Sequence, residues 1–344
     1  MTDTISICNT KIGPGQPAFI IAEIGSNHDG DLEQAKALIN AAAKAGANAV
    51  KFQSFTASGL LNPIKIGDGG QQQDPVYNVL EKLELPVEWH SELKQYADNC
   101  GVMFLSASFD RGRAELLNQI DVPAFKIASS EITNLPFLQY VAKLGKPIIL
   151  STGMAYLDEV GQALRAIYET GNRQVILLHC VANYPPRFAD ANIRAMLTMA
   201  AAFNVPAGYS DHFPGDVVSL AAVALGARVI EKHITPDRNL PGPDHSYALE
   251  IPEFTEMISK IRNLEPALGT GEKVPTAGEM PVRLGAFRSI YAAVDIPEGA
   301  KITPDMLKCV RPGGGLPAEY FNLVVGRIAR ADIKAHEKIS WEKV

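Results

Sequence analysis

Short apolar runs alternate with longer amphipathic segments from about residue 18 to residue 269. The runs are rich in Ile, Val, Leu and Phe, which is typical of strands buried on both faces. The longer segments repeat apolar positions with the helical period, and several end in Gly, a common helix stop. The pattern predicts strands at 18–24, 49–53, 102–107, 124–129, 147–152, 175–180, 207–212 and 228–233. It predicts clear helices at 32–46, 88–101, 157–171, 216–226 and 253–269.

The number of these strand-then-helix units limits the fold class. Eight units fit a (β/α)8 barrel of the TIM type, which typically needs ~250 residues. An open doubly wound sheet is the alternative, but it usually has fewer strands. Unit count and length together favour the α/β barrel.

One connection, residues 54–87, is unusually long and contains GDGGQQQD at 67–74. Long insertions between a strand and its helix are often lids or binding loops. A tolerated surface loop explains the length equally well. The sequence leaves both interpretations open.

The alternation of strands and helices ends after residue 269, and the composition changes. Residues 269–281, GTGEKVPTAGEMP, have the composition of a linker. Short β-like stretches follow at 289–296, 324–333 and 337–341. We therefore expect a barrel domain over 1–272, a linker over 273–285 and a small, mostly β domain over 286–344. A domain of this size is marginally stable alone.

Composition and charge exclude several classes of protein. The net charge of −6 gives no global electrostatic reason to bind nucleic acid or an anionic membrane. The four cysteines are far apart, which argues against a disulfide framework or a cysteine zinc site. No signal peptide and no transmembrane run is apparent. We expect a soluble cytoplasmic protein.

Polar residues stand at the predicted strand ends, where the active sites of such barrels lie. A single one is often a satisfied core group, but so many buried polar groups would be costly without a function. The ends carry Glu23, Lys51, Gln53, Ser106, Lys126, Ser129, Glu131, Ser151, His179, Asn183, Tyr184, Ser210, His212, Glu231 and His233.

Two pairs among these residues suggest specific chemistry. Lys51 and Lys126, with hydroxyls nearby, can bind a phosphate and a carboxylate, although internal ion pairs to Glu23 or Glu131 would also explain them. His212 and His233 end neighbouring strands about 4.8 Å apart, so they can share one metal ion. A core histidine remains the alternative for either residue alone.

After the last predicted strand, LPGPDH at 240–245 would hold Asp244 rigidly over the barrel mouth. Its carboxylate could bind substrate hydroxyls. A plain rigid turn is the competing interpretation, and the sequence alone does not separate the two.

The ordered set AEIGSNHDGDL, KFQ, KIASSE, PIILSTGM, HCVANYP, GYSDH, EKH and PGPD resembles the sialic acid (N-acetylneuraminate) synthase family. The tail, with RSIYAAVDIPEGAKIT, RPGGGL and VGRIARADIKAHEKI, resembles that family's antifreeze-like (SAF) domain. The resemblance covers nearly the whole chain. It implies a TIM barrel followed by a SAF domain.

The resemblance also implies a reaction. Family members condense phosphoenolpyruvate with an N-acyl hexosamine such as N-acetylmannosamine, releasing phosphate, with Mn²⁺ or Mg²⁺ on histidines that match His212 and His233. Glu23 and Glu131 match proton-transfer carboxylates. The residues that bind phosphoenolpyruvate in the family match Lys51, Lys126, Ser129, Ser151 and Ser210. Sugar contacts match Gln53, Tyr184 and Asp244. Arg311 matches an arginine that a partner subunit inserts, which implies a domain-swapped homodimer.

The sequence departs from the family pattern at two motifs. A phosphate-binding Thr of the family falls on Ala107, so Ser106 or Ser108 would substitute for it. A sugar-contacting Asn falls on Ala182, with Asn183 beside it. Legionaminic or pseudaminic acid synthase therefore remains an alternative, as do another barrel carboligase and a non-catalytic sugar-binding barrel.

Overall fold

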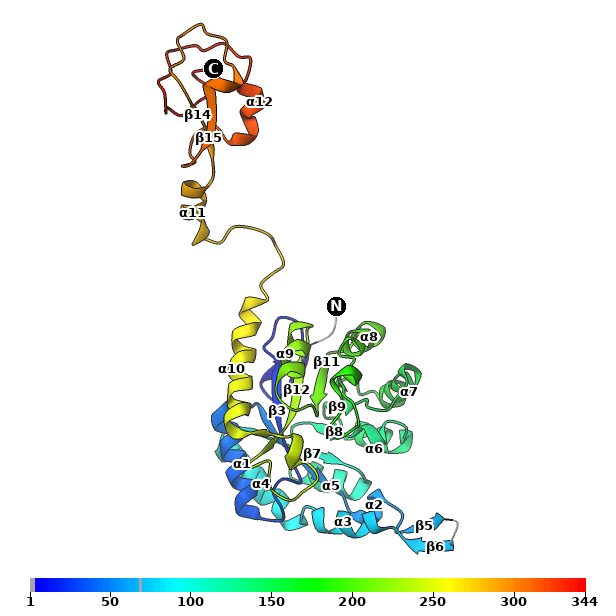
Figure 1. Cartoon of the computed structure of the whole chain (residues 1–344). Helices are drawn as coiled ribbons and strands as arrows, with labels where there is room; N and C mark the ends of the chain where they lie inside the picture. The colour runs from blue at the N-terminus through cyan, green and yellow to red at the C-terminus, as the bar shows by residue number, and fades with distance from the viewer. Residues whose placement is uncertain (1–3, 68–69) are drawn as a thin grey trace. The chain divides into compact units, whose positions relative to one another are not determined.

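The computed structural model describes residues 4–67 and 70–344. The chain divides into two compact units, Met1–Gly269 and Thr270–Val344 (Figure 1). Each unit has its own hydrophobic core. The units are therefore described separately.

The first unit is the expected barrel. Among the described residues, eight parallel strands pair in chain order, and the last returns to the first through β12–β3. They are β3 (Phe19–Gly25), β4 (Ala49–Ser54), β7 (Met103–Ser108), β8 (Phe125–Ile127), β9 (Ile148–Ser151), β10 (Val175–His179), β11 (Ala207–Asp211) and β12 (Val229–Thr235). A two-residue strand, β13 (Leu249–Glu250), adds to β12. The prediction of a (β/α)8 barrel is confirmed.

Helices surround the strands, as Figure 1 shows for α1, α4 and α10. Asp31 caps α1 by accepting from the backbone of Glu33 and Gln34, and Gly46 ends it in the left-handed region. The barrel helices are α1 (Leu32–Ala45), α4 (Val87–Asn99), α5 (Arg111–Gln119), α6 (Leu135–Lys143), α7 (Leu157–Tyr168), α8 (Arg194–Phe203), α9 (Val217–Ala224) and α10 (Ile251–Ala267).

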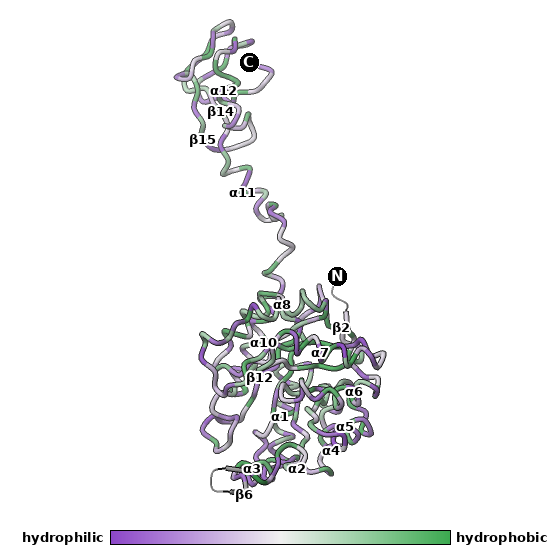
Figure 2. The backbone as a smooth tube through the Cα atoms, turned by 90° about the vertical axis from the view of Figure 1, so that its right-hand side faces the viewer, coloured by the Kyte–Doolittle hydropathy of each residue, from purple (hydrophilic) through white to green (hydrophobic). Residues whose placement is uncertain are grey.

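Strand alternation separates two apolar cores. Outward residues pack against the helices, whereas inward residues such as Ile21, Leu105 and Ile149 fill the barrel interior. Figure 2 shows the hydrophobic positions along the barrel strands and hydrophilic ones on the outer loops. Toward the carboxyl ends of the strands the inward positions become polar, and this change creates the candidate site.

A hairpin that the sequence pattern did not predict closes the other end of the barrel. Strands β1 (Ile5–Ile7) and β2 (Thr10–Ile12) pair antiparallel. Their residues Ile5, Ile7 and Ile12 are buried against the apolar interior layer. Three-residue strands are too short to give a periodic signal, which is why the pattern missed them.

The long connection between β4 and α4 has secondary structure of its own. It contains α2 (Ala57–Leu60), the hairpin β5 (Ile64–Gly67) and β6 (Gly70–Gln73), and α3 (Pro75–Leu83). Asp74 caps α3 by accepting from the backbone of Val76 at 2.9 Å. We call this segment, residues 54–87, the excursion. It lies at the lower end of the barrel in Figure 1.

The second unit begins with coil and α11 (Glu279–Ala286), a helix that overlaps the end of the expected linker. Strands β14 (Ser289–Ala292) and β15 (Leu307–Val310) pair antiparallel, followed by the short helix α12 (Phe321–Val324). The predicted stretches 324–333 and 337–341 place Ile333 and Ile339 in the core. They pair only through single bridges, so they are not regular strands. The domain boundaries at 272 and 286 remain a prediction.

No helix within 4–67 and 70–344 is both long and apolar enough to cross a lipid bilayer.

Candidate active site

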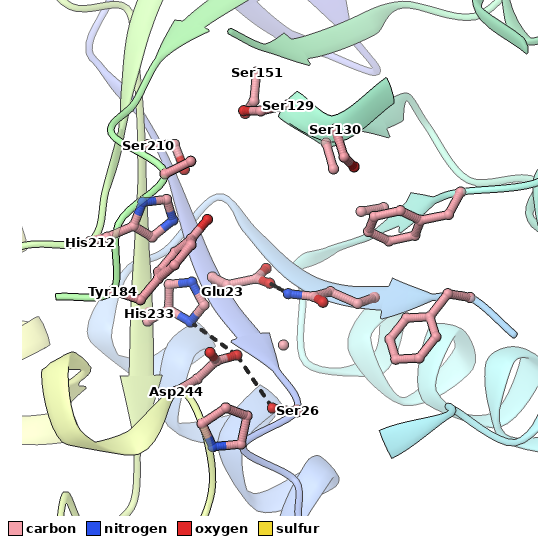
Figure 3. A pocket seen from close by; sticks show the side chains of 18 of the residues that line it. Glu23, Ser26, Ser129, Ser130, Ser151, Tyr184, Ser210, His212, His233 and Asp244 are labelled. Atoms are coloured by element: carbon pink, nitrogen blue, oxygen red, sulfur yellow. Dashed lines mark hydrogen bonds and ion pairs between the residues drawn. The ribbon is translucent and has the colours of Figure 1, made fainter. Parts of the chain in front are cut away.

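A cavity of about 570 Å³ opens at the carboxyl ends of the barrel strands. Its size is typical of a small-molecule site. Inward side chains of the strands form its floor, and residues of the excursion form one wall. In Figure 3, His212, His233 and Tyr184 lie on one side of the cavity, and Ser129 and Ser130 lie across from them.

Two lysines and two glutamates meet at the floor. The register places Glu23 beside Lys51, and the Lys51 Nζ lies 2.8 Å from Glu23 Oε2 and 3.6 Å from Glu231 Oε1. Lys126 Nζ lies 3.9 Å from the same Glu231 oxygen. All four side chains are buried. When both glutamates are ionised the four charges balance, and each ion has a partner in a place where an unpaired one would be very costly.

The two carboxyl groups differ in acidity although they share a neighbour. Burial raises the pKa of Glu23 to about 7. Burial also opposes ionisation of Glu231, but Lys126 and Lys51 outweigh it and lower the pKa of Glu231 to about 2. Glu231 is therefore ionised at neutral pH, whereas Glu23 can exchange a proton there. Such a divergence of two carboxyl groups is the usual signature of acid–base assignment.

Hydroxyl groups complete the floor. Lys126 Nζ donates to Ser151 Oγ at 2.7 Å, and burial lowers the pKa of Lys126. Ser210 Oγ donates to Glu231 Oε1 at 2.9 Å. Ser129 Oγ accepts from the backbone of Gly153 at 2.9 Å and lies 3.2 Å from Cys180 Sγ, a contact in which either atom can be the donor. Ammonium and hydroxyl donors in one buried patch suit a phosphate or a carboxylate.

His212 and His233 face each other with ring centroids 5.3 Å apart. Burial lowers the pKa of His212 to about 3 and that of His233 to about 4, so both imidazoles are neutral. His212 Nδ1 lies 3.2 Å from the carbonyl oxygen of Val181. A carbonyl only accepts, so Nδ1 of His212 carries the proton and Nε2 has a free lone pair.

The histidine pair fits a divalent metal ion with an incomplete protein shell. His233 Nδ1 is buried and has no hydrogen-bond partner, and Asp244 Oδ2 lies 3.8 Å away. Two neutral imidazoles, one with an unsatisfied nitrogen, are suitable ligands. No group of three or more His, Cys, Asp or Glu among the described residues could hold an ion. Water or substrate would have to supply the remaining ligands.

Asp244 is held in place at the cavity edge. Tyr247 donates its hydroxyl to Asp244 Oδ1 at 2.6 Å. Ser26 Oγ donates to Asp244 Oδ2 at 3.3 Å (Figure 3). The Tyr247 ring also packs 5.1 Å from that of His233. Tyr184 lies edge-on to His212, with ring centroids 4.6 Å apart. The two hydrogen bonds hold the Asp244 carboxylate, whose Oδ2 lies 3.8 Å from His233 Nδ1.

Gly25 has no side chain, so the side chains of Glu23 and Asp244 can approach each other there. Its φ of +55° is in the left-handed region, and a Cβ there would lie 3.1 Å from Asp244 Oδ2 and 3.2 Å from Glu23 Oε1. Gln53 reaches the same place and donates to Glu23 Oε1 at 3.0 Å. Glycine thus meets both a backbone and a packing requirement at this position.

The cavity brings together most of the side chains that the sequence nominated. Their binding roles remain predictions. The nominated residues that line it are Glu23, Lys51, Gln53, Lys126, Ser129, Ser151, Tyr184, Ser210, His212, His233 and Asp244.

Ser106 and Glu131 do not line the cavity. Ser106 stands at an outward position of β7, and its hydroxyl hydrogen-bonds that of Ser54 at 2.6 Å. Glu131 turns away to accept from Asn134 Nδ2 at 2.9 Å and Ser130 Oγ at 3.2 Å. Strand parity explains the first difference, because the inward residue next to Ser106 is Ala107.

Asn183 and Arg311 also lie outside the cavity lining. Asn183 is exposed, and its neighbours Ala182 and Tyr184 line the cavity instead. Arg311 belongs to the second unit. The structure of the barrel alone therefore assigns neither residue a contact in the site.

The sequence interpretation missed three contributors. Glu231 was noticed at a strand end but not assigned a role, although it lies two residues before His233 and so faces the same side of β12. No sequence motif pointed to Tyr247, because its hydrogen bond to Asp244 depends on the turn that joins the two residues. The apolar wall from the excursion could not be foreseen without the position of α3.

Comparison with known proteins agrees with this geometry. The profile of the NeuB family matches residues 38–273, and that of the SAF domain matches residues 287–344. The chain belongs to the NeuB family. The suspected relationship to sialic acid synthases, and the SAF identity of the tail, are thereby confirmed.

Two similar relatives are named as sugar acid synthases. An N,N'-diacetyllegionaminic acid synthase of Legionella pneumophila is 41% identical over 96% of each chain. A human N-acetylneuraminate-9-phosphate synthase is 37% identical, covering 97% of this chain and 94% of its own.

Solved structures show the same fold. A spore coat polysaccharide biosynthesis protein of Bacillus subtilis, SpsE, aligns with a TM-score of 0.69 and 40% identity over 99% of both chains. An N-acetylneuraminic acid synthetase of Leptospira borgpetersenii, crystallised with citrate, aligns with a TM-score of 0.74 and 35% identity over 82% of this chain and 95% of that one.

Proposed function

We propose that this NeuB-family enzyme condenses phosphoenolpyruvate with an N-acyl hexosamine and water, giving a nonulosonic acid and phosphate. N-acetylmannosamine is the first acceptor to test, with N-acetylneuraminate as its product. The observation that carries the proposal is one cavity in which buried Lys51 and Lys126 lie among hydroxyls and the neutral pair His212 and His233 faces the same space.

The floor suits the anionic substrate. Phosphoenolpyruvate carries a phosphate and a carboxylate, and Lys51 and Lys126 with Ser129, Ser151 and Ser210 offer ammonium and hydroxyl donors for both. Binding would draw the lysines partly away from Glu23 and Glu231. The anion would then share the lysines with the two glutamates, and protonation of Glu23, whose pKa is raised to about 7, would offset part of the added negative charge.

The chain's own groups supply positioning and proton transfer. The C3 carbon of phosphoenolpyruvate forms a bond to the acceptor aldehyde, and water adds at C2. The tetrahedral intermediate then breaks its C2–O bond and releases phosphate. Glu23, with its pKa raised to about 7, can take the proton from the water or return one to the aldehyde oxygen. Asp244 and Gln53 orient acceptor hydroxyls.

His212 and His233 would hold the Mn²⁺ or Mg²⁺ that the family resemblance implies. When bound, such an ion polarises a carbonyl oxygen. The neutral state of both rings and the unsatisfied Nδ1 of His233 support this assignment.

A diacetamido hexose is the second candidate acceptor. Two relatives named N,N'-diacetyllegionaminic acid synthase are 41% and 42% identical to this chain. The relatives named for pseudaminic acid and for N-acetylneuraminate-9-phosphate are both 37% identical. The decisive test measures phosphate release with each acceptor, with and without chelator, and identifies the product by mass. No release with any acetamido sugar would refute the enzyme proposal.

Arg311 and the subunit arrangement form a separate part of the proposal. Arg311 precedes Pro312 and three glycines in the SAF domain. From the family resemblance we expect it to contact the acceptor in a partner subunit of a domain-swapped homodimer. Sedimentation should show a dimer. Mixing Arg311→Ala chains with His212→Ala chains should restore part of the activity. Verified heterodimers without recovery would contradict action across subunits.

A further inference from the structure

Helix α3 carries an apolar stripe that no core covers. Val76, Val79, Leu80 and Leu83 recur at the spacing of one helix face, a pattern that normally packs against a protein interior. None of the residues of α3 is buried, and Val76 and Val79 are 53% and 54% exposed. All four line the cavity. The stripe faces the substrate space instead of a core.

The wall is held in place by polar contacts at its base. Glu84, just after α3, accepts from the backbone of Ala57 at 2.6 Å, and Arg113 lies 3.8 Å from its other oxygen. Phe55 continues the apolar surface and stacks edge-on against Phe109, with centroids 5.9 Å apart. The wall is therefore tied to α2 within the excursion and to α5 of the barrel before any ligand arrives.

Charge is distributed unevenly around the cavity. Among the described residues that line it, the lysine and arginine cations are Lys51 and Lys126, and both lie at the floor beside Glu231. The described residues of the excursion contribute only apolar side chains to the lining. An anion placed against α3 would lose its hydration without gaining a partner, which is costly.

We propose that α3 receives the end of the acceptor remote from its aldehyde, and that it selects an acceptor that is uncharged there and carries methyl or acyl groups. The inference rests on the proposed function. Phosphoenolpyruvate, as an anion, belongs at the lysine floor, and the reacting aldehyde must lie next to it. The far end of a hexose then points away from the floor, toward the apolar wall.

Val79 is the position for the test, because it is half exposed and its substitution should not affect folding. Wild type should use an unphosphorylated acceptor at least about tenfold better, in kcat/KM, than its 6-phosphate. Val79→Ser should raise the KM for the neutral acceptor about 5- to 10-fold and leave the KM for phosphoenolpyruvate unchanged. Val79→Lys should shift the preference toward the 6-phosphate by a similar factor.

Glu81→Gln is the matched control. It changes the net charge of the same helix by +1, as Val79→Lys does, because it removes one negative charge. Glu81 is exposed and does not line the cavity. Its kinetic constants should match those of wild type. Thermal melting of all variants checks the fold, and hydrogen exchange across α3 should slow when acceptor is added to the full-length protein.

Three results would overturn the inference. One is a wild type that prefers the phosphorylated acceptor. Another is Val79→Ser with an unchanged acceptor KM, or with an equal change in the KM for phosphoenolpyruvate. A third is a change of oligomeric state in Val79→Lys without a change in acceptor preference. The apolar stripe of α3 would then be a protein–protein interface. Absence of turnover with every acceptor is distinct from these, because it refutes the proposed function and the inference falls with it.

Discussion

At the amino-terminal end of the barrel the inward positions hold Ile, Leu, Val, Phe and Ala, whereas the next inward position on most of the same strands holds Glu, Lys or Ser. Strand β9 contains both kinds, with Ile149 in the apolar layer and Ser151 at the cavity floor. The β1–β2 hairpin covers the first end, and the second end opens into the cavity. One end is closed by apolar side chains, and the other holds buried ionic groups.

The difference shows how stability and function divide along a strand. Apolar burial at the closed end contributes to folding. The ion cluster of Glu23, Lys51, Lys126 and Glu231 contributes little net stability, because pairing only offsets the loss of hydration. We therefore expect substitutions at the closed end to change stability and substitutions at the open end to change kinetics.

The largest effect should come from the histidine pair. His212→Ala and His233→Ala should each reduce turnover about a thousandfold or more, because each removes one of two protein ligands. The melting temperature should stay close to that of wild type. Elemental analysis should show lost metal in both variants but not in His179→Ala, whose side chain faces Ala191 outside the cavity. Full activity after exhaustive chelation would contradict the metal assignment.

The closed end should respond in the opposite way. Ile149→Ala should lower the free energy of unfolding of the barrel by about 3 kcal/mol through the cavity it leaves. Ser151→Ala, two residues along the same strand, should change stability much less but should raise the KM for phosphoenolpyruvate. Denaturant melts and steady-state kinetics on both variants make the comparison. Equal kinetic effects would mean that the two ends do not divide these tasks.

Lys126→Met should raise the KM for phosphoenolpyruvate about a hundredfold and change the acceptor KM little. The reason is the loss of an ammonium group from a buried anion site, where charge–charge interactions are strong. Lys51→Met should act in the same direction. If both KM values rose together, the lysines would be structural partners of Glu231 and not substrate ligands.

The two buried carboxyl groups should give opposite pH dependences of stability. The folded-state pKa of Glu23 is raised from 4.5 to about 7, so between these values unfolding releases its proton and stability falls as pH rises. Wild type should lose about 2 kcal/mol relative to Glu23→Gln between about pH 5 and pH 7.

For Glu231 the folded-state pKa is lowered to about 2, so its contribution is present above 4.5 and is lost as pH falls. Unfolding curves of Glu231→Gln at several pH values provide that comparison. Parallel pH profiles for the two variants would show that the two carboxyl groups are not differentiated.

The smallest effect should come from Tyr247→Phe, which removes one hydrogen bond to Asp244 and keeps the ring. We expect about a tenfold rise in acceptor KM with little change in the KM for phosphoenolpyruvate. A purely structural role would instead lower the melting temperature and leave the ratio of the two KM values unchanged.

The pattern of residues along the chain predicts the barrel and much of its site. Eight apolar runs of strand length, separated by amphipathic helices, admit few other folds. Polar residues at successive strand ends are informative because parallel strands bring their carboxyl ends together. Glu23, Lys51, His212 and His233 could therefore be nominated without coordinates.

Tertiary structure alone decided which nominated side chains reach the cavity. Ser106 and Ala107 are neighbours in sequence, but strand parity turns one toward Ser54 and the other into the site. The pKa values of Glu23 and Glu231 depend on which lysine each approaches, a consequence of strand register. The stripe of α3 reads in sequence as an ordinary buried helix face. Only the path of the excursion turns it toward the substrate space, because hydrophobic spacing specifies that a face will be apolar and not what will cover it.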